Sequence, residues 1–191
     1  MAPSTSDLLI RDLTPDDAEA FFEIRLEALE GHPEAFASSA QEWRQRTPDE
    51  VRHRLLVTDD QVMAGAFRSQ KLLGIMGLFR QSGPKLSHKA YVIAVYVRPE
   101  ARGTGLSGQI LDHLIRRARQ LPGLRQLHLG VAVGNTSAER LYESRGFTTY
   151  GVERRALLVD GAFVDEAHMQ LFLDDFHNHS IRSGRERRGE F

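Results

Sequence analysis

Two glycines separated by a single residue follow an apolar, strand-like segment in the middle of the chain. That segment runs from Tyr91 to Val97, and the stretch Arg102-Gly103-Thr104-Gly105-Leu106-Ser107 then leads into a helical pattern. Glycines at such a junction let backbone amides turn toward a ligand without a Cβ in the way. The first turn of the helix adds unpaired N–H groups and the positive end of its dipole. The pattern therefore predicts an anion site, with a phosphate as the expected ligand.

The same residues, Gly103 to Gly108, also read as G-x-G-x-x-G, the fingerprint of a dinucleotide site. In that fingerprint the first glycine follows the strand directly, whereas residues 98–102 intervene here. An acidic residue is also expected about 20 positions on, yet none lies between Asp112 and Glu139. A dinucleotide-dependent oxidoreductase therefore stays a minor hypothesis. A tight strand-to-helix turn without any ligand stays open as well.

Hydrophobic periodicity and capping residues predict an α/β chain with one main sheet. The helix that follows the glycines, 106–119, carries one continuous apolar stripe. The apolar segments 91–97 and 125–133 are typical of central strands buried on both faces. The expected elements are a strand at 8–13, helices at 14–30, at 33–46 and from 47, strands at 61–67, 72–80 and 91–97, a helix at 106–119, a strand at 125–133, a helix at 138–144, and strands at 147–159 and 166–173.

Composition fits a single globular domain, which we assign to residues 1–174 of the 191. The absence of cysteine excludes disulfides, thiolate metal sites and a cysteine acyl-enzyme. A net charge of −1 does not favour nucleic-acid binding. No basic leader is present and no apolar run approaches the ~20 residues that span a bilayer. We therefore expect a soluble, cytoplasmic protein without a membrane partner.

The last residues, 175–191, are polar and basic, and we expect them to form a disordered tail. His177 and His179 in this tail are interpreted as part of a solvated segment, so no metal site is predicted. The arginines Arg182, Arg185, Arg187 and Arg188 are interpreted in the same way, and a weak contact with nucleic acid or an acidic protein is the alternative.

Two motifs taken together resemble those of the GNAT-superfamily N-acetyltransferases. Arg102 to Ser107 is similar to the family's R/Q-x-x-G-x-G/A motif, with Ser107 in place of the final glycine or alanine. Asn135 to Phe147 is similar to the family's N-x-x-A-x-x-L-Y-x-x-x-G-F segment. The resemblance covers residues 8–173, and it is strong from 91 to 150 and weak before 72. It implies an α/β (α+β) fold whose mixed, mostly antiparallel sheet is flanked by helices and splayed at its two central strands.

The resemblance also implies acetyl-CoA as cosubstrate and assigns site residues by position. Amides of the glycine turn, residues Arg102, Gly103, Thr104, Gly105, Leu106 and Ser107, would bind the pyrophosphate. The pantetheine arm would lie along Val95, Tyr96 and Val97, whose N–H groups could also hold the thioester oxyanion. Asn135 would cap its helix or contact the pantetheine. Tyr142 would face the sulfur and protonate the departing thiolate.

The general base does not carry over from the family. Many relatives place a glutamate on the central strand, but residues 90–97 contain no acid. The candidates are therefore His88, the Glu23 and Glu27 face, Asp165 and Glu166. Because this carboxylate is missing, a non-catalytic acyl-CoA sensor on the same fold is the alternative function. A small amine, a peptide N-terminus and a lysine side chain all stay open as acceptors, and a homodimer is compatible with the sequence.

Overall fold

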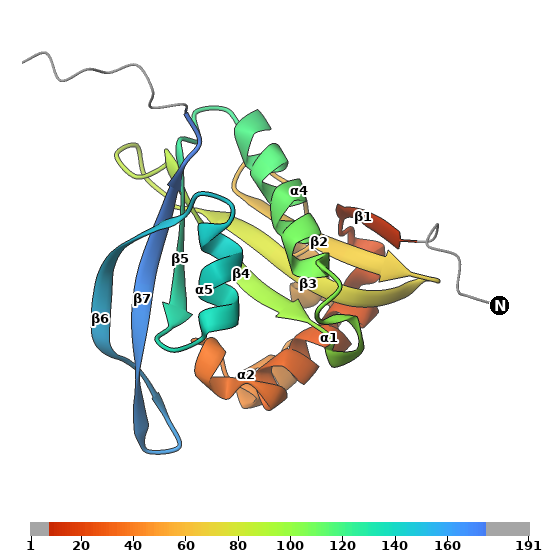
Figure 1. The fold of residues 1–191 in the computed structure, drawn as a ribbon. Coiled ribbons are helices and arrows are strands. Elements are labelled where there is room, and N and C mark those ends of the chain that lie inside the picture. Colours follow the sequence, from red (N-terminus) through yellow and green to blue (C-terminus); the bar gives the residue numbers. More distant parts are fainter. Residues whose placement is uncertain (1–7, 175–191) are drawn as a thin grey trace, which may run out of the picture.

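The computed structural model describes residues 8–174, which form seven strands and eight helical segments (Figure 1). The strands form one sheet in the order β1-β2-β3-β4-β5-β7-β6. The strands are β1 Leu8–Asp12, β2 Gln61–Arg68, β3 Lys71–Arg80, β4 Lys89–Val97, β5 Gln126–Ala132, β6 Thr148–Val159 and β7 Ala162–Phe172. The α-helices are α1 Ala18–Gly31, α2 Ala40–Arg44, α3 Pro48–His53, α4 Leu106–Gln120 and α5 Thr136–Glu143, and short 3₁₀ turns are η1 Pro15–Asp17, η2 Pro33–Ala35 and η3 Pro99–Ala101.

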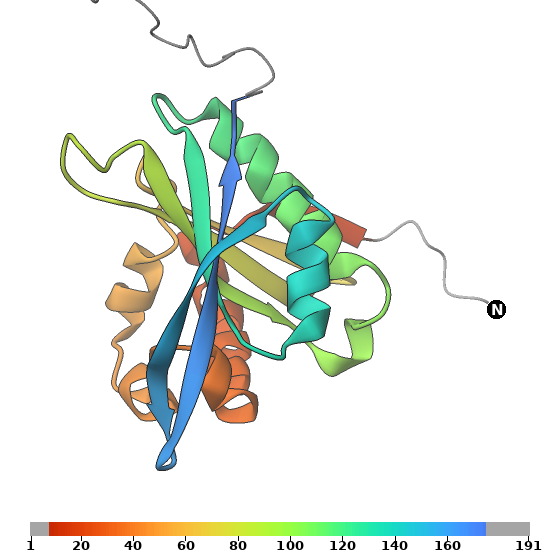
Figure 2. The ribbon, with the colours of Figure 1, turned by 60° about the vertical axis from the view of Figure 1, so that its left-hand side comes forward.

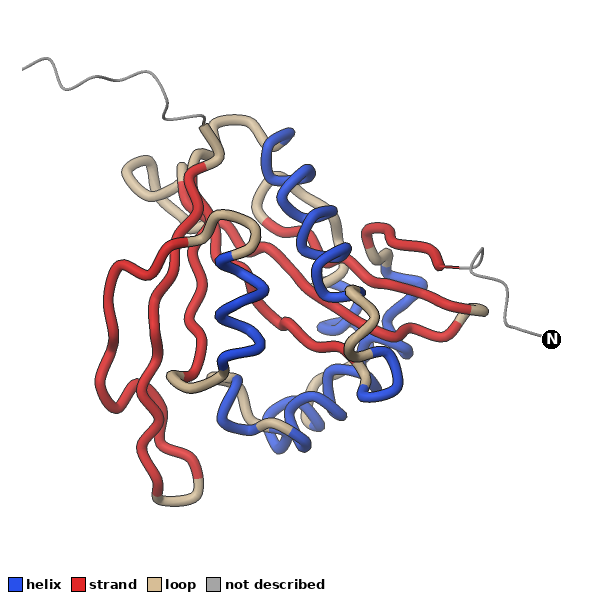
Figure 3. Tube along the Cα trace, viewed as in Figure 1, coloured by secondary structure: helices blue, strands red, loops and turns tan. Residues whose placement is uncertain are grey.

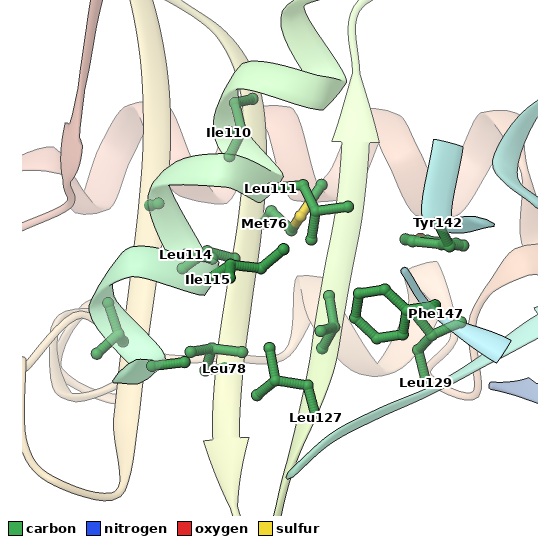
Figure 4. Close-up of a cluster of buried hydrophobic side chains, with 14 of the residues drawn as sticks. Met76, Leu78, Ile110, Leu111, Leu114, Ile115, Leu127, Leu129, Tyr142 and Phe147 are labelled. Carbon is green, nitrogen blue, oxygen red and sulfur yellow. The ribbon is translucent and has the colours of Figure 1, made fainter. Parts of the chain in front are cut away.

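Helices cover the two faces of the sheet and define two cores. The apolar stripe of α4 packs on one face, where Ile110, Leu111 and Leu114 meet Met76 and Leu78 of β3 (Figure 4). The opposite face lies against α1, α2 and α3, with Phe21, Ile24 and Trp43 in the second core. The turned view in Figure 2 shows α4 and α1 on opposite sides of the strands. Burial of these aliphatic and aromatic side chains is the main term that holds the layers together.

The sheet divides at its centre, between β4 and β5. These two strands are the parallel pair, and they are joined only at Lys89↔Gln126, Ala90↔Leu127 and Tyr91↔His128. Beyond Tyr91 the strands diverge, and β5 continues to pair with β7 as far as Ala132 (Figures 1 and 3). All other strand pairs are antiparallel. The expected splay in a mostly antiparallel sheet is therefore confirmed.

A β-bulge in β4 accompanies this divergence. Ile93 pairs with Gly77 and Tyr96 with Ile75, so Ala94 and Val95 together oppose the single residue Met76. Ala94 has a φ of 55°, in the left-handed region that an alanine seldom adopts. A bulge bends its strand and increases the local twist. The bulge thus lies where β4 turns away from β5.

Three expectations for individual elements were wrong. The helix expected at 33–46 is interrupted, because Phe36 is extended and Ser39 starts a new helix by forming a capping box with Glu42. The strand β4 is not buried on both faces, since Ile93 to Val95 are only half-buried along the divergence from β5. The last strand begins at Ala162 rather than at 166, because it pairs with β6 right up to the hairpin turn.

No helix in the described part of the chain is long and apolar enough to cross a membrane. The predicted tail at 175–191, with its two histidines and four arginines, lies outside the described residues. The same holds for residues 1–7.

Candidate active site

A cleft with a volume of about 420 Å³ occupies the divergence between β4 and β5. One wall is β4 from Tyr91 to Val95, and the other is β5 from Gly130 to Ala132. Helix α5 contributes Asn135, Ala138 and Tyr142, and β7 contributes Glu166 and His168. Helix α1 and the segment from Ala35 to Ser38 also line the cleft. Strands that have separated leave backbone N–H and C=O groups without a ladder partner, so an amide-bearing chain that enters between them can satisfy those groups.

The glycine turn lies immediately before α4, as the sequence predicts. Gly103 and Gly105 both adopt left-handed φ values, 72° and 78°, and Gly105 is the N-cap of α4. A Cβ at either glycine would meet no atom within 4 Å, so the space above the turn is open. Thr104 Oγ1 donates to the Ala101 carbonyl at 2.7 Å and fixes the loop. Open space beside a helix N-terminus is what an anionic group requires.

The Arg102 side chain turns back onto the protein instead of reaching over the turn. Its Nε donates to the Val97 carbonyl at 3.0 Å, and its guanidinium lies 5.6 Å from the Tyr96 ring. A terminal nitrogen lies 3.0 Å from His32 Nε2. Arg102 therefore links the turn to the end of α1, and only its backbone amide is available to the turn.

The third glycine of the G-x-G-x-x-G pattern has a packing role. A Cβ at Gly108 would lie 2.1 Å from an Arg145 guanidinium nitrogen, and Arg145 Nε in turn pairs with Asp112 at 3.2 Å. Gly108 is thus needed where α4 approaches the residue that follows α5. The glycine at position 108 is therefore explained by packing, without a phosphate-binding role.

Tyr142 is 4 % exposed and lies on α5 at the cleft, with its ring 5.7 Å from that of Phe147 (Figure 4). Burial raises the pKa of the Tyr142 hydroxyl well above its usual value. No hydrogen bond to this hydroxyl is present among residues 8–174. Tyr142 is therefore protonated at neutral pH and has a donor to offer to a group in the cleft.

Asn135 caps α5, with its Oδ1 accepting from the Ala138 amide at 3.2 Å. The cap uses the oxygen of the side chain, so the NH₂ group has its two donors left. Val95 lines the cleft. Tyr96 instead packs its ring toward α1, where its hydroxyl donates to Glu27 at 3.3 Å, and Val97 is buried in the core under α4. Tyr96 and Val97 can therefore face the divergence only with their backbone.

Among the five candidates for the general base, Glu166 lines the cleft and the other four do not. Glu27 is held by Tyr96 and by Arg98, whose Nε is 3.0 Å away. Asp165 pairs with Arg154 and accepts from the Arg155 amide. His88 lies at the opposite end of β4, where its carbonyl accepts from the amides of β5. Glu23 is exposed on α1.

The Glu166 side chain reaches its position because β5 has a glycine there. A Cβ at Gly130 would lie 2.9 Å from Glu166 Oε2, so a larger residue would displace the carboxylate. Its neighbour His168 pairs with Glu153 at 2.9 Å. Glu166 thus lies across β5, on the wall of the cleft that faces β4.

Two residues of this site have no counterpart in the sequence prediction. Ala94 shapes the cleft through its bulge, and an alanine gives no sequence signal for a left-handed conformation. Arg25 lines the cleft and is only 9 % exposed. A signal for Arg25 was present, because it lies on the buried stripe of α1 with Phe21 and Leu29, four residues away on either side. A charged residue at a core position of an amphipathic helix is uncommon unless it is paired.

Among the described residues, no group of three or more histidine and acidic side chains could hold a metal ion. The arrangement instead offers a cleft between two diverging strands, an open glycine turn at the start of α4 and a buried phenol at the cleft. These features suit a long phosphate-bearing cosubstrate whose reactive end reaches Tyr142.

Comparison with known proteins gives the family. Residues 18–147 match the model of the acetyltransferase (GNAT) family. A mycothiol acetyltransferase of Geodermatophilus obscurus is 29 % identical over 141 residues, which cover 72 % of this chain but only 43 % of that protein. The chain therefore spans less than half the length of this curated relative.

Solved structures agree on the fold. A GNAT-family acetyltransferase of Streptococcus pneumoniae superposes with a TM-score of 0.79 at 24 % identity, over 87 % of this chain and 99 % of that one. A Salmonella typhimurium protein solved with its cofactor acetyl-CoA gives 0.77 at 24 % identity, over 92 % and 99 % of the two chains. Together with the match over residues 18–147, the divided sheet and the glycine turn show that this chain belongs to the acetyltransferase (GNAT) family.

Proposed function

We propose that this protein transfers the acetyl group of acetyl-CoA directly to a primary amine. The observation that carries the proposal is the end of β4–β5 pairing at Tyr91, which opens a cleft lined by both strands and by Tyr142. The amides of residues 102–107 would bind the pyrophosphate. The pantetheine arm would bond to the backbone of β4 near Val95, with the Asn135 NH₂ group as a further donor.

In the reaction the neutral amine nitrogen attacks the thioester carbon, the C–S bond breaks and the sulfur leaves as a thiolate, which takes up the proton that the nitrogen loses as the amide forms. Backbone N–H groups near the Ala94 bulge would stabilise the oxyanion that forms on the carbonyl oxygen. Tyr142 would donate its hydrogen to the thiolate. Proton transfer from an ordinary phenol to a thiolate is unfavourable by about 2 kcal/mol. Burial raises the pKa of Tyr142 and makes this transfer less favourable still. Tyr142 therefore acts chiefly by hydrogen-bonding the developing negative charge.

The amine must lose a proton before it attacks. For an ordinary alkylamine this costs roughly 4–5 kcal/mol at pH 7, so a nearby base is needed. We assign this role to Glu166, since it is the candidate carboxylate that lines the cleft with Tyr142. A water molecule between the amine and the carboxylate would serve equally well as the route for the proton.

The first test measures cosubstrate binding and turnover on the purified protein. Acetyl-CoA at 100 times its Kd should add about 2.7 kcal/mol to the free energy of unfolding. Release of free thiol should then depend on an added amine. Stabilisation without thiol release across a broad amine panel would favour the alternative, a non-catalytic acyl-CoA sensor. Absence of stabilisation would contradict both functions.

The second test concerns the base. Glu166→Gln keeps the shape of the side chain and should lower kcat on the order of 10²-fold, with the loss partly recovered at higher pH as the amine deprotonates by itself. Glu143→Gln, at an exposed position near the end of α5, is the matched control. An unchanged pH–rate profile in Glu166→Gln would remove Glu166 from this role.

A further inference from the structure

Arg25 is a buried cation without an anion. It is 9 % exposed, its Nη1 is fully buried, and its guanidinium makes no hydrogen bond among the described residues. The guanidinium makes a cation–π contact with Phe36, whose ring centroid lies 4.3 Å from the Arg25 Cζ. An arginine offers five donors, and a buried charge is normally paired. Such a group in the wall of a cleft indicates that its partner is a ligand.

The surroundings of Arg25 add to its positive charge. Arg54, at the end of α3, lines the same cleft and lies 5.7 Å from the Trp43 ring. Burial first, and then the charge of Arg54, lower the pKa of Arg25 to about 10, which still leaves it charged at neutral pH. Two cations on one wall favour an anionic ligand and disfavour a polyamine.

The wall of the cleft formed by β5 and β7 carries a negative charge. Glu166 and His168 of β7 line the cleft across from α1, and Glu166 is the acid that faces it. The segment from Ala35 to Ser38 closes the cleft between the two walls, with η2 against β5 and β6. A ligand with an amine at one end and an anion at the other would satisfy both walls.

We infer that the acceptor is a small amine that carries a carboxylate, of the α-amino-acid type, with its carboxylate on the Arg25 guanidinium and its amine toward Glu166. The inference deepens the proposed function and rests on it for the chemical step. A guanidinium binds a carboxylate through two parallel N–H···O bonds, which Arg25 has free. The cleft of about 420 Å³ must hold the thioester arm as well, which favours a small acceptor over a folded protein.

The decisive comparison uses matched ligands on the wild-type protein. Leucine, methionine and phenylalanine are compared with spermidine and with their α-amides, in which a neutral amide replaces the carboxylate and the amine loses its proton more readily, a difference that by itself would favour the amides. Thiol release should favour the acids over the amides by at least about 10-fold in kcat/KM, because loss of the anion leaves the buried arginine unpaired. Equal rates for acids and amides, or a preference for spermidine, would overturn the inference.

Binding can be followed without any turnover. Trp43 is the single tryptophan of the chain and lines the cleft, so its fluorescence reports on ligands there. Titration with the acids in the presence of CoA should change this fluorescence, and the amides should do so only at about 10-fold higher concentration. If no acid binds while other amines release thiol, the acceptor assignment fails and the acetyltransferase survives. If the acids bind but no thiol is released, the proposed acetyl transfer fails and only a binding site for these acids remains.

Two substitutions assign the effect to Arg25. Arg25→Met should abolish the preference for acids, and Arg25→Lys should retain part of it, because lysine keeps the charge but loses the planar fork. Arg119→Met, at an exposed position in the last turn of α4, should keep the wild-type preference. Since Arg25→Met removes an unpaired buried charge, its melting temperature should not fall. An acid preference that persists in Arg25→Met would overturn the inference.

Discussion

The two sides of the cleft are built from different materials. On the proposed cofactor side, which comprises residues 102–107, the β4 edge and α5, the expected contacts come mainly from backbone amides placed by left-handed glycines. On the proposed acceptor side, formed by α1, the segment from Ala35 to Ser38, Arg54 and Glu166, they come from side chains brought together by tertiary packing. A site made of backbone constrains local sequence tightly, whereas a site made of side chains can change its ligand with one substitution.

Tyr142 stands between the two sides, and its removal should have the largest effect. Tyr142→Phe keeps the ring against Phe147 but removes the donor, so kcat should fall on the order of 10²-fold or more while acetyl-CoA affinity is retained. Thiol release and an acetyl-CoA titration measure the two quantities. Tyr150→Phe, an exposed tyrosine on β6, is the control. Turnover close to wild type in Tyr142→Phe would remove the hydroxyl from the mechanism.

The proposed binding of acetyl-CoA by backbone amides can be tested by adding a single methyl group to the glycine turn. In Gly105→Ala the new Cβ meets no protein atom within 4 Å, so its effect on the ligand-free protein is limited to a φ of 78° that alanine disfavours. We expect a loss of about 1 kcal/mol in stability, and acetyl-CoA affinity about 10-fold lower as the turn shifts. Gly31→Ala, at the exposed end of α1 with ordinary φ, should leave the affinity unchanged and should not lower the stability. Full affinity in Gly105→Ala would show that side chains, not amides, bind there.

The smallest effect is expected at the point where β4 and β5 separate. His128 is the last residue of β5 that pairs with β4. Burial first, and then the nearby Lys89, His88 and His168, lower the pKa of His128. The folded state therefore binds this proton less readily than the unfolded chain, so stability is complete above about pH 6.5 and declines as the pH falls below that value.

Denaturant unfolding at several pH values checks this expectation. His128→Gln should flatten the decline below about pH 6.5, and His53→Gln, at an exposed position of α3, should leave the decline as it is. If the free energy of unfolding declines with the same slope in the wild type and in His128→Gln, other groups cause the loss of stability at low pH.

The sequence predicts the cofactor side better than the acceptor side, for a physical reason. Gly103 and Gly105 occupy conformations that other residues avoid, and Asn135 caps a helix through a short local contact, so both leave signals within a few residues. The mostly antiparallel sheet and its splay followed from the family resemblance, whereas the order of the strands was not predicted. The bulge at Ala94 left no such signal, because alanine has no preference for a positive φ.

The acceptor side depends on contacts between distant residues. Arg25 contacts Phe36 because the helical segment that begins at Pro33 ends before Phe36, and the capping box of Ser39 and Glu42 then starts the next helix. Glu166 could be named as a candidate, yet only the geometry across Gly130 separates it from Asp165 and Glu27. Which acid lies at the cleft is a property of the folded sheet.

The extra residue in β4 makes the strand sensitive to the deletion of a single residue. Two residues, Ala94 and Val95, oppose Met76, so loss of one codon would restore ordinary register and leave Tyr96 paired with Ile75. The reading frame and both cores would persist, but the bend that carries β4 away from β5 would be gone. In genetic terms, we expect a single codon to set how far β4 stands from β5.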